Sequence, residues 1–167
     1  MFGFLSRKKL IKDDLKGIAK LMYQDVSDDA WDQENLTKKK LDFSTESIRY
    51  IDMYTKRLMT TEMGTALLNE HFDNFVARIG AYIGEVIKKN LNQDFLWYEF
   101  DSVYLSSSKL DGVQKAIKTE AVLYSKKRDL VILPLSVVAQ FLEESCSYPN
   151  FLNYVEEMIK LNAQTSY

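Results

Sequence analysis

The stretch GAYIGEVIKKN, from Gly80 to Asn90, places two glycines four residues apart inside a run whose apolar residues recur at helical spacing. Each glycine inside a helix costs roughly 0.5–1 kcal/mol relative to alanine, so the pair requires a compensating contact. On a helix, Gly80 and Gly84 lie one turn apart on the same side and leave a groove that another backbone or a flat ring can approach closely. We therefore expect both glycines to pack against a neighbouring element inside the fold.

Two neighbours are candidates for this groove: the aromatic strand around Trp97 and Tyr98, and the C-terminal helix. The same glycine spacing drives helix pairing in membranes, but charged residues stand on both sides of it here, which excludes that role. A phosphate-binding loop is excluded as well, because the stretch has neither the G-x-G-x-x-G pattern nor a G-K-[ST] sequence between a strand and a helix.

Outward from the glycines, hydrophobic periodicity predicts an α+β domain in which a layer of about five helices packs on a small antiparallel sheet of about three strands. Helices are expected at residues 10–22, from Ser44 to about residue 60, from Leu68 to Leu91, at 135–145 and from Pro149 onward. Strands are expected in FLWYEFDSVYL (95–105), AVLYS (121–125) and LVILP (130–134), the last two as a hairpin. The helix at 68–91 is the longest and is expected to be the central element.

Length and composition indicate a folded intracellular protein. The 167 residues are expected to form a single domain, with an N-terminal helix and acidic loop at 1–41 and the core at 42–167. The 22 basic and 24 acidic residues give a net charge of −2, which disfavours general nucleic-acid binding. One cysteine, Cys146, and the lack of an apolar run of about 20 residues favour a cytoplasmic protein that is not embedded in a membrane.

The segment QDVSDDAWDQEN, residues 24–35, is the strongest candidate for a partner-binding surface. It surrounds the large aromatic side chain of Trp31 with acidic residues and contains no basic one. The acidic residues are Asp25, Asp28, Asp29, Asp32 and Glu34. Tryptophan is enriched among interface hot spots, and acidic neighbours would complement a basic partner and speed its association. The alternative is a solvated connector in which Trp31 merely anchors the loop to the core.

No constellation of side chains in the sequence specifies catalysis, a metal site or a bound cofactor. His71 is the only histidine, and Cys146 lacks the flanking motif of a nucleophile. Glu85 has two interpretations: a surface ion pair with Lys88 or Lys89, or a buried carboxylate that ties its helix to a strand. No residue is assigned to catalysis or to a metal. Structural roles are assigned to Gly80, Gly84, Glu85 and Trp97.

The octapeptide GAYIGEVI, the polar break at 90–94, the aromatic strand with Trp97, the hairpin ending in Pro134 and two closing helices resemble a loose group of small bacterial proteins of unknown function. In that group the core helix reads G-A-Y-[LI]-G-E-[VIL]. The resemblance covers residues 42 onward, and the octapeptide is its specific part. Proteins of this general type resemble the immunity proteins that accompany bacterial toxins. The resemblance implies a protein partner and implies no catalytic residues.

The sequence therefore predicts a non-enzymatic protein-binding module, most concretely a cytoplasmic immunity protein that neutralises a cognate toxin by occluding it. The alternative is a structural or regulatory interaction domain that pairs with itself or with an adaptor through the helix of Gly80 and Gly84. A third interpretation is an unrecognised hydrolase centred on Glu85 or His71. No cofactor, nucleic acid or membrane is expected as a partner.

Overall fold

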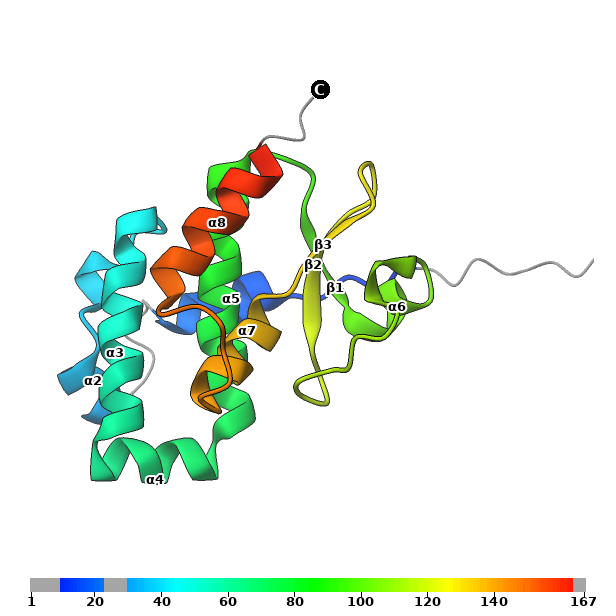
Figure 1. Ribbon diagram of the computed structural model, residues 1–167. Coiled ribbons are helices and arrows are strands. Elements are labelled where there is room, and N and C mark those ends of the chain that lie inside the picture. Colours follow the sequence, from blue (N-terminus) through cyan, green and yellow to red (C-terminus); the bar gives the residue numbers. More distant parts are fainter. Residues whose placement is uncertain (1–9, 23–29, 164–167) are drawn as a thin grey trace, which may run out of the picture.

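The computed structural model describes residues 10–22 and 30–163 of the chain. Most helices gather on one side of a three-stranded antiparallel sheet and one short helix lies on the other side (Figure 1), which confirms the expected α+β class. The described residues contain eight α-helices rather than the expected five or so. They are α1 (Leu15–Ala19), α2 (Ala30–Asn35), α3 (Ile48–Thr60), α4 (Glu62–Glu70), α5 (Phe72–Leu91), α6 (Phe100–Tyr104), α7 (Pro134–Leu142) and α8 (Phe151–Ala163).

The longest helix, α5, is the element on which α1, α7 and α8 pack. It begins after His71, where the backbone leaves helical geometry (φ −127°, ψ 36°), so the single helix expected from Leu68 is in fact α4 followed by α5. It ends at Leu91, and Asn92 follows in a left-handed conformation, which asparagine tolerates better than most residues. Neither α5 nor any other helix in the described ranges is both long and apolar enough to cross a membrane.

The two faces of the sheet belong to two hydrophobic clusters. Its strands, in spatial order, are β1 (Leu96–Glu99), β2 (Ala121–Ser125) and β3 (Leu130–Ile132). Trp97 is aligned with Leu123, which is aligned with Ile132, and all three belong to the main core on the helical side. Tyr98 and its partner Val122 belong to a smaller cluster beneath α6. This alternation follows from the two-residue period of a strand, and the expected hairpin of β2 and β3 is confirmed.

The start of the described chain differs from the prediction of one helix over residues 10–22. Its first residues are extended and lie along the free edge of β1. The Glu99 N–H donates to the carbonyl of Ile11 (2.8 Å), and the Asp13 N–H donates to the carbonyl of Trp97 (3.1 Å). Helical structure is limited to α1 and a following 3₁₀ turn, Lys20–Met22. These main-chain hydrogen bonds therefore cover an edge that would otherwise leave polar groups of β1 unpaired.

A second difference lies directly after β1, where the expected strand over 95–105 stops at Glu99. The chain then forms α6, in which Phe100 and Val103 are both buried in the smaller cluster. A spacing of three residues places two side chains on the same face of a helix, whereas in a strand they would point to opposite faces. Burial of both side chains on one side of the sheet therefore favours the helix.

The described residues before position 42 pack into the same hydrophobic core as the rest of the protein. Leu15 and Met22 are buried in the same hydrophobic cluster as the apolar side chains of α5. Trp31, Leu36 and Leu41 are buried there as well. Residues before position 42 therefore contribute to the main core rather than forming a separate appendage.

Gly80 and Gly84 meet close neighbours inside the fold, as their spacing predicts. A Cβ atom on Gly80 would lie 2.8 Å from Cδ1 of Leu135 in α7, and a Cβ atom on Gly84 would overlap the indole ring of Trp97. Pro134 also lies 3.3 Å from the latter position. The aromatic strand thus fills half of the groove, and the start of α7 occupies the place expected for the C-terminal helix.

Replacing Gly84 with alanine should lower the free energy of unfolding by about 1–3 kcal/mol, because the added methyl group forces the Trp97 ring out of its buried position. Gly17→Ala is the matched control. The atoms nearest to its Cβ belong to the exposed side chain of Asp14, from 3.1 Å, which can move aside, and alanine is the better helix former, so no loss of stability is expected. Urea unfolding measures the free energy of unfolding of both variants. An unchanged midpoint for Gly84→Ala would contradict the proposed packing.

Candidate functional site

The acidic segment predicted to bind a partner is only partly described. The predicted binding residues outside the described ranges are Asp25, Asp28 and Asp29. From Ala30 onward the segment is not a loop but the helix α2. Glu34 is exposed on this helix, whereas Trp31 is only 7% exposed and Asp32 is completely buried.

Asp32 is buried because both oxygens of its carboxylate have partners inside the protein. The Tyr54 hydroxyl donates a hydrogen bond to Oδ1 (2.7 Å), and Nη2 of Arg78 donates to Oδ2 (2.7 Å). These contacts tie α2 to α3 and α5. Trp31 and Asp32 therefore hold α2 on the core, and in this conformation neither is accessible to a partner, which corrects their assignment to a binding surface.

Glu85 combines the two roles that the sequence left open. Its Oε2 lies 2.9 Å from Nζ of Lys88 and also accepts a hydrogen bond from the indole N–H of Trp97 (3.3 Å). The residue is 9% exposed, so the carboxylate is a buried link between α5 and β1 as well as an ion-pair partner.

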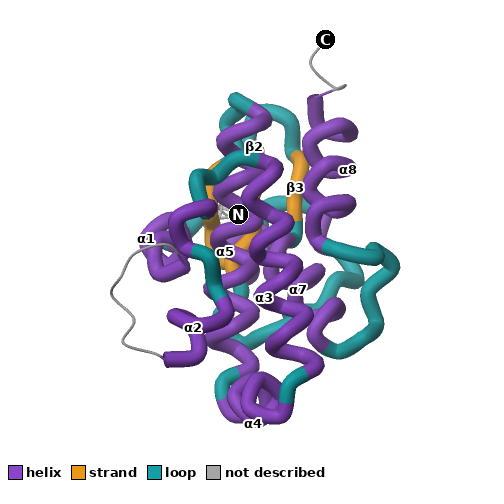
Figure 2. The backbone as a smooth tube through the Cα atoms, turned by 90° about the vertical axis from the view of Figure 1, so that its left-hand side faces the viewer, coloured by secondary structure: helices purple, strands orange, loops and turns teal. Residues whose placement is uncertain are grey.

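A pocket of about 360 Å³ lies beside this carboxylate. Most of its lining residues come from α5 and from α1 with the turn that follows it, and these two helices pack against each other (Figure 2). Phe43 and Glu85 line it together with four lysines. The lysines are Lys16, Lys20, Lys88 and Lys89. Two of them come from α1 and the turn that follows it, and two come from the last turn of α5, so the cations face the pocket from two elements distant in sequence.

The four lysines differ in how their charge is used. Lys88 is paired with Glu85, and Nζ of Lys89 donates to the main-chain carbonyl of Asp42 at 3.4 Å. Lys16 and Lys20 are exposed and form no ion pair with any side chain that the structure describes. The pocket therefore carries more positive than negative charge on a chain whose net charge is −2.

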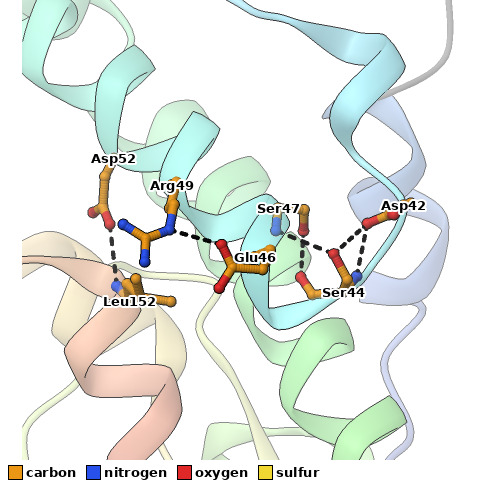
Figure 3. Close-up of polar contacts among 7 residues, drawn as sticks. All are labelled: Asp42, Ser44, Glu46, Ser47, Arg49, Asp52 and Leu152. Atoms are coloured by element: carbon orange, nitrogen blue, oxygen red, sulfur yellow. Dashed lines mark hydrogen bonds and ion pairs between the residues drawn. The ribbon is translucent and has the colours of Figure 1, made fainter.

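Side-chain hydrogen bonds hold the turn that runs from Asp42 to Ser47 (Figure 3). The Asp42 carboxylate accepts hydrogen bonds from the Ser44 N–H (3.0 Å) and hydroxyl (2.5 Å), and these hydrogen bonds hold the pKa of Asp42 below its usual value. The Ser47 N–H in turn donates to the Ser44 hydroxyl (3.2 Å), so Ser44 caps the 3₁₀ turn, Thr45–Ser47, at which the helix expected from Ser44 begins. Phe43 itself has φ +62° and donates its N–H to the Tyr82 hydroxyl (3.0 Å).

A second pocket, of about 280 Å³, collects carboxylates near the edge of β1. Its acidic lining residues are Asp13, Glu99, Asp101 and Glu120. Burial, and secondarily the charge of Glu99, raise the pKa of Asp13, and burial raises the pKa of Glu120. Glu120 nevertheless has structural partners, since it accepts hydrogen bonds from the Ser136 hydroxyl (2.5 Å) and the Ala116 N–H (3.2 Å). Among the described residues no group of three or more potential ligands is placed to hold a metal ion.

His71 and Glu85, the two residues considered for hydrolysis, lie far apart. His71 is exposed at the N-terminal end of α5, whereas Glu85 is fourteen positions further along the same helix. At 1.5 Å per residue this separation is about 20 Å along the axis, so the two side chains do not share a site. Cys146 is partly exposed after α7, and its sulfur accepts a hydrogen bond from the main-chain N–H of Tyr148 (3.5 Å).

The lysine pocket is the functional candidate that sequence reasoning missed. Lys16 and Lys20 are four residues apart and therefore share a helix side, which was readable in the sequence. The sequence did not show that these two lysines lie near Lys88 and Lys89, because that proximity depends on the packing of α1 against α5, about seventy residues apart in the chain.

Comparisons of the chain with protein-family models, with curated proteins and with solved structures found no match. The resemblance of the octapeptide to immunity-type proteins is neither supported nor contradicted by that result.

Asp32→Ala should lower the free energy of unfolding by about 3–5 kcal/mol, because it leaves the mostly buried guanidinium of Arg78 without its counter-charge. The control is Glu46→Gln, which removes the exposed ion pair of Glu46 with Arg49 (2.8 Å; Figure 3) and should leave stability nearly unchanged. Thermal and urea unfolding give the comparison. Similar small losses in both variants would show that Asp32 is not a structural anchor.

Proposed function

We propose that this protein is a non-enzymatic protein-binding module, and most concretely a bacterial, cytoplasmic immunity protein that neutralises a cognate toxin by occluding it. The observation that carries the proposal is the lysine pocket between α1 and α5. Cations that converge on one pocket, where the one lining carboxylate is already held by Lys88 and Trp97, favour binding over catalysis. The resemblance of GAYIGEVI to proteins of the immunity type supplies the more specific identity.

The partner surface proposed for this pocket is acidic. Lys16 and Lys20 have no acidic partner among the described residues, so a carboxylate of another chain could pair with them without breaking any ion pair of that part of the chain. Complementary charges also disfavour unrelated partners with a basic surface. The pocket therefore replaces the acidic segment at 24–35 as the proposed point of contact.

The two rival functions receive less support. Self-pairing through Gly80 and Gly84 would require displacement of Leu135 and Trp97, which already fill that helix face. A hydrolase centred on Glu85 would require this carboxylate to leave Lys88 and Trp97. One centred on His71 would have only the exposed carboxylate of Glu70, 3.8 Å away, to orient the imidazole among the described residues. Neither rearrangement has an evident source of free energy.

The proposal predicts that charge reversal at Lys16 and Lys20 abolishes protection. The test expresses the reading frame adjacent to this gene, with and without the protein, and follows growth. We expect the neighbour to inhibit growth, the unaltered protein to relieve inhibition, and Lys16→Glu with Lys20→Glu to raise the Kd for the purified partner about tenfold or more. Calorimetry at low and high salt measures that change.

The matched control is Lys56→Glu with Lys160→Glu, which alters the net charge equally at exposed positions outside the pocket. This variant should protect as well as the unaltered protein. Equal protection by both double variants would remove the pocket from the interface. A neighbouring chain that neither inhibits growth nor binds would contradict the immunity function itself.

A further inference from the structure

Glu85 is the one carboxylate among the described residues that line the lysine pocket. Its Oε2 lies 2.9 Å from Nζ of Lys88 and accepts the indole N–H of Trp97 at 3.3 Å. Its other oxygen, Oε1, accepts no hydrogen bond from the described part of the chain. The fold thus holds a negative group in a fixed position in a pocket whose other charges are positive.

The three remaining cations of the pocket are available to a ligand. Lys16 and Lys20 form no ion pair with a described side chain, and Nζ of Lys89 donates to the main-chain carbonyl of Asp42 at 3.4 Å. Lys16 and Lys20 lie one turn apart on one wall, and Lys89 comes from the last turn of α5 on the other. A ligand that uses all three must therefore distribute its negative charge over separate groups.

The carboxylate of Glu85 opposes one class of anion. An ionised carboxylate accepts hydrogen bonds but donates none. It therefore attracts a donor such as an N–H group, and it repels an anionic oxygen that approaches it. Like charges placed together are one means by which a binding site excludes unsuitable partners. The position of Glu85 among the lysines thus gives the pocket a selectivity that positive charge alone does not provide.

We propose that Glu85 determines the specificity of the lysine pocket, which binds an acidic peptide segment of the partner and rejects phosphate-type anions. The carboxylates of the segment face Lys16, Lys20 and Lys89, and its main-chain N–H groups lie next to Glu85. This inference rests on the proposed function, because it specifies the chemistry of the partner at the same pocket.

A peptide and a phosphate-type anion differ in what they place beside Glu85. Each acidic residue of a peptide brings an N–H donor together with its carboxylate, and successive carboxylates are spaced along the chain. A phosphate-type anion presents closely spaced acceptor oxygens, so its approach to the lysines also brings negative charge to Glu85. Lys88 and Lys89 lie at the negative end of the α5 dipole, which adds to this repulsion. No described lining residue carries a guanidinium group, which binds phosphate through two parallel hydrogen bonds.

The test uses the full chain, labelled with ¹⁵N, and two probes of similar total charge, a capped tetraglutamate peptide and inorganic tripolyphosphate. Both are titrated at the same ionic strength, and the amide signals of Lys16, Lys20 and Lys89 report binding at the pocket. We expect the peptide to bind at least about threefold more tightly than tripolyphosphate. Tighter binding of tripolyphosphate, or shifts confined to residues outside the pocket, would overturn the inference.

Glu85→Gln isolates the effect of the carboxylate, because the amide keeps an oxygen that accepts the Trp97 N–H and adds N–H donors for an anion. In this variant tripolyphosphate should gain at least about tenfold in affinity and the peptide about threefold or less, so the preference for the peptide disappears. The matched control is Glu62→Gln, which changes the net charge equally at an exposed position of α4 outside the pocket and should preserve the preference. If Glu85→Gln does not fold, the relative affinities of the two probes for the unaltered protein still decide the selectivity.

Lysine variants connect the peptide to the pocket. Lys16→Gln with Lys20→Gln should weaken binding of the peptide about fivefold or more, whereas Lys56→Gln with Lys160→Gln, at exposed positions outside the pocket, should leave its affinity unchanged. Equal losses in the two double variants would show that the peptide is attracted by net charge rather than bound at the pocket, and would contradict the inference.

The inference and the proposed function can fail separately. If charge reversal at Lys16 and Lys20 abolishes protection but Glu85→Gln leaves the preference for the peptide unchanged, the proposed function stands and the role assigned to Glu85 is wrong. If the preference responds to Glu85→Gln as expected but charge reversal does not affect protection, the pocket selects acidic peptides and the proposed function fails.

Discussion

The fold depends on the contact between the indole ring of Trp97 and the bare backbone of Gly84, because this contact joins the sheet to the central helix. An aromatic side chain buries about 150–250 Å², which at about 25 cal/mol per Å² is worth about 4–6 kcal/mol. The glycine costs roughly 1 kcal/mol as an interior helix residue. Burial therefore exceeds the cost of the glycine several-fold, provided that no side chain separates the ring from the helix. The indole N–H is satisfied in the same contact, since it donates to Glu85.

Strand β1 also determines the geometry of the lysine pocket, because it positions both walls. One wall is set through Glu85, which binds Trp97 of β1 and holds Lys88 at 2.9 Å. The other wall is set through residues 10–13, whose main chain pairs with the free edge of β1 immediately before α1 begins. The spacing between the two pairs of lysines is thus a consequence of how the chain on either side packs on one four-residue strand.

Local signals in the sequence sufficed for the elements that local chemistry controls. The helix expected from Ser44 is present as a capped turn followed by α3, the longest helix contains both glycines, and the hairpin of β2 and β3 follows from two apolar runs around a polar turn. The fold class followed from these elements. Tertiary contacts decided the rest. The apolar residues at 10–13 fit a helical period, but the main chain there forms hydrogen bonds with β1 instead. Asp32 was expected in a solvated acidic loop, because the sequence does not show that its partners, Tyr54 and Arg78, come from other helices. The lysine pocket could not be predicted either, because it also depends on contacts between elements distant in the sequence.

Electrostatics distinguishes the lysines that the fold retains for its own stability from those with charge available to a ligand. Lys88 and Lys89 occupy the C-terminal turn of α5, where the helix dipole favours cations, and Lys88 also has Glu85. Lys16 and Lys20 have no such compensation among the described residues. With a net charge of −2, the whole molecule does not attract an acidic partner from afar, and at physiological ionic strength the lysines act over only about 8 Å. Selection in the proposed interface therefore occurs at contact, and it governs how long the partner stays bound more than how fast it arrives.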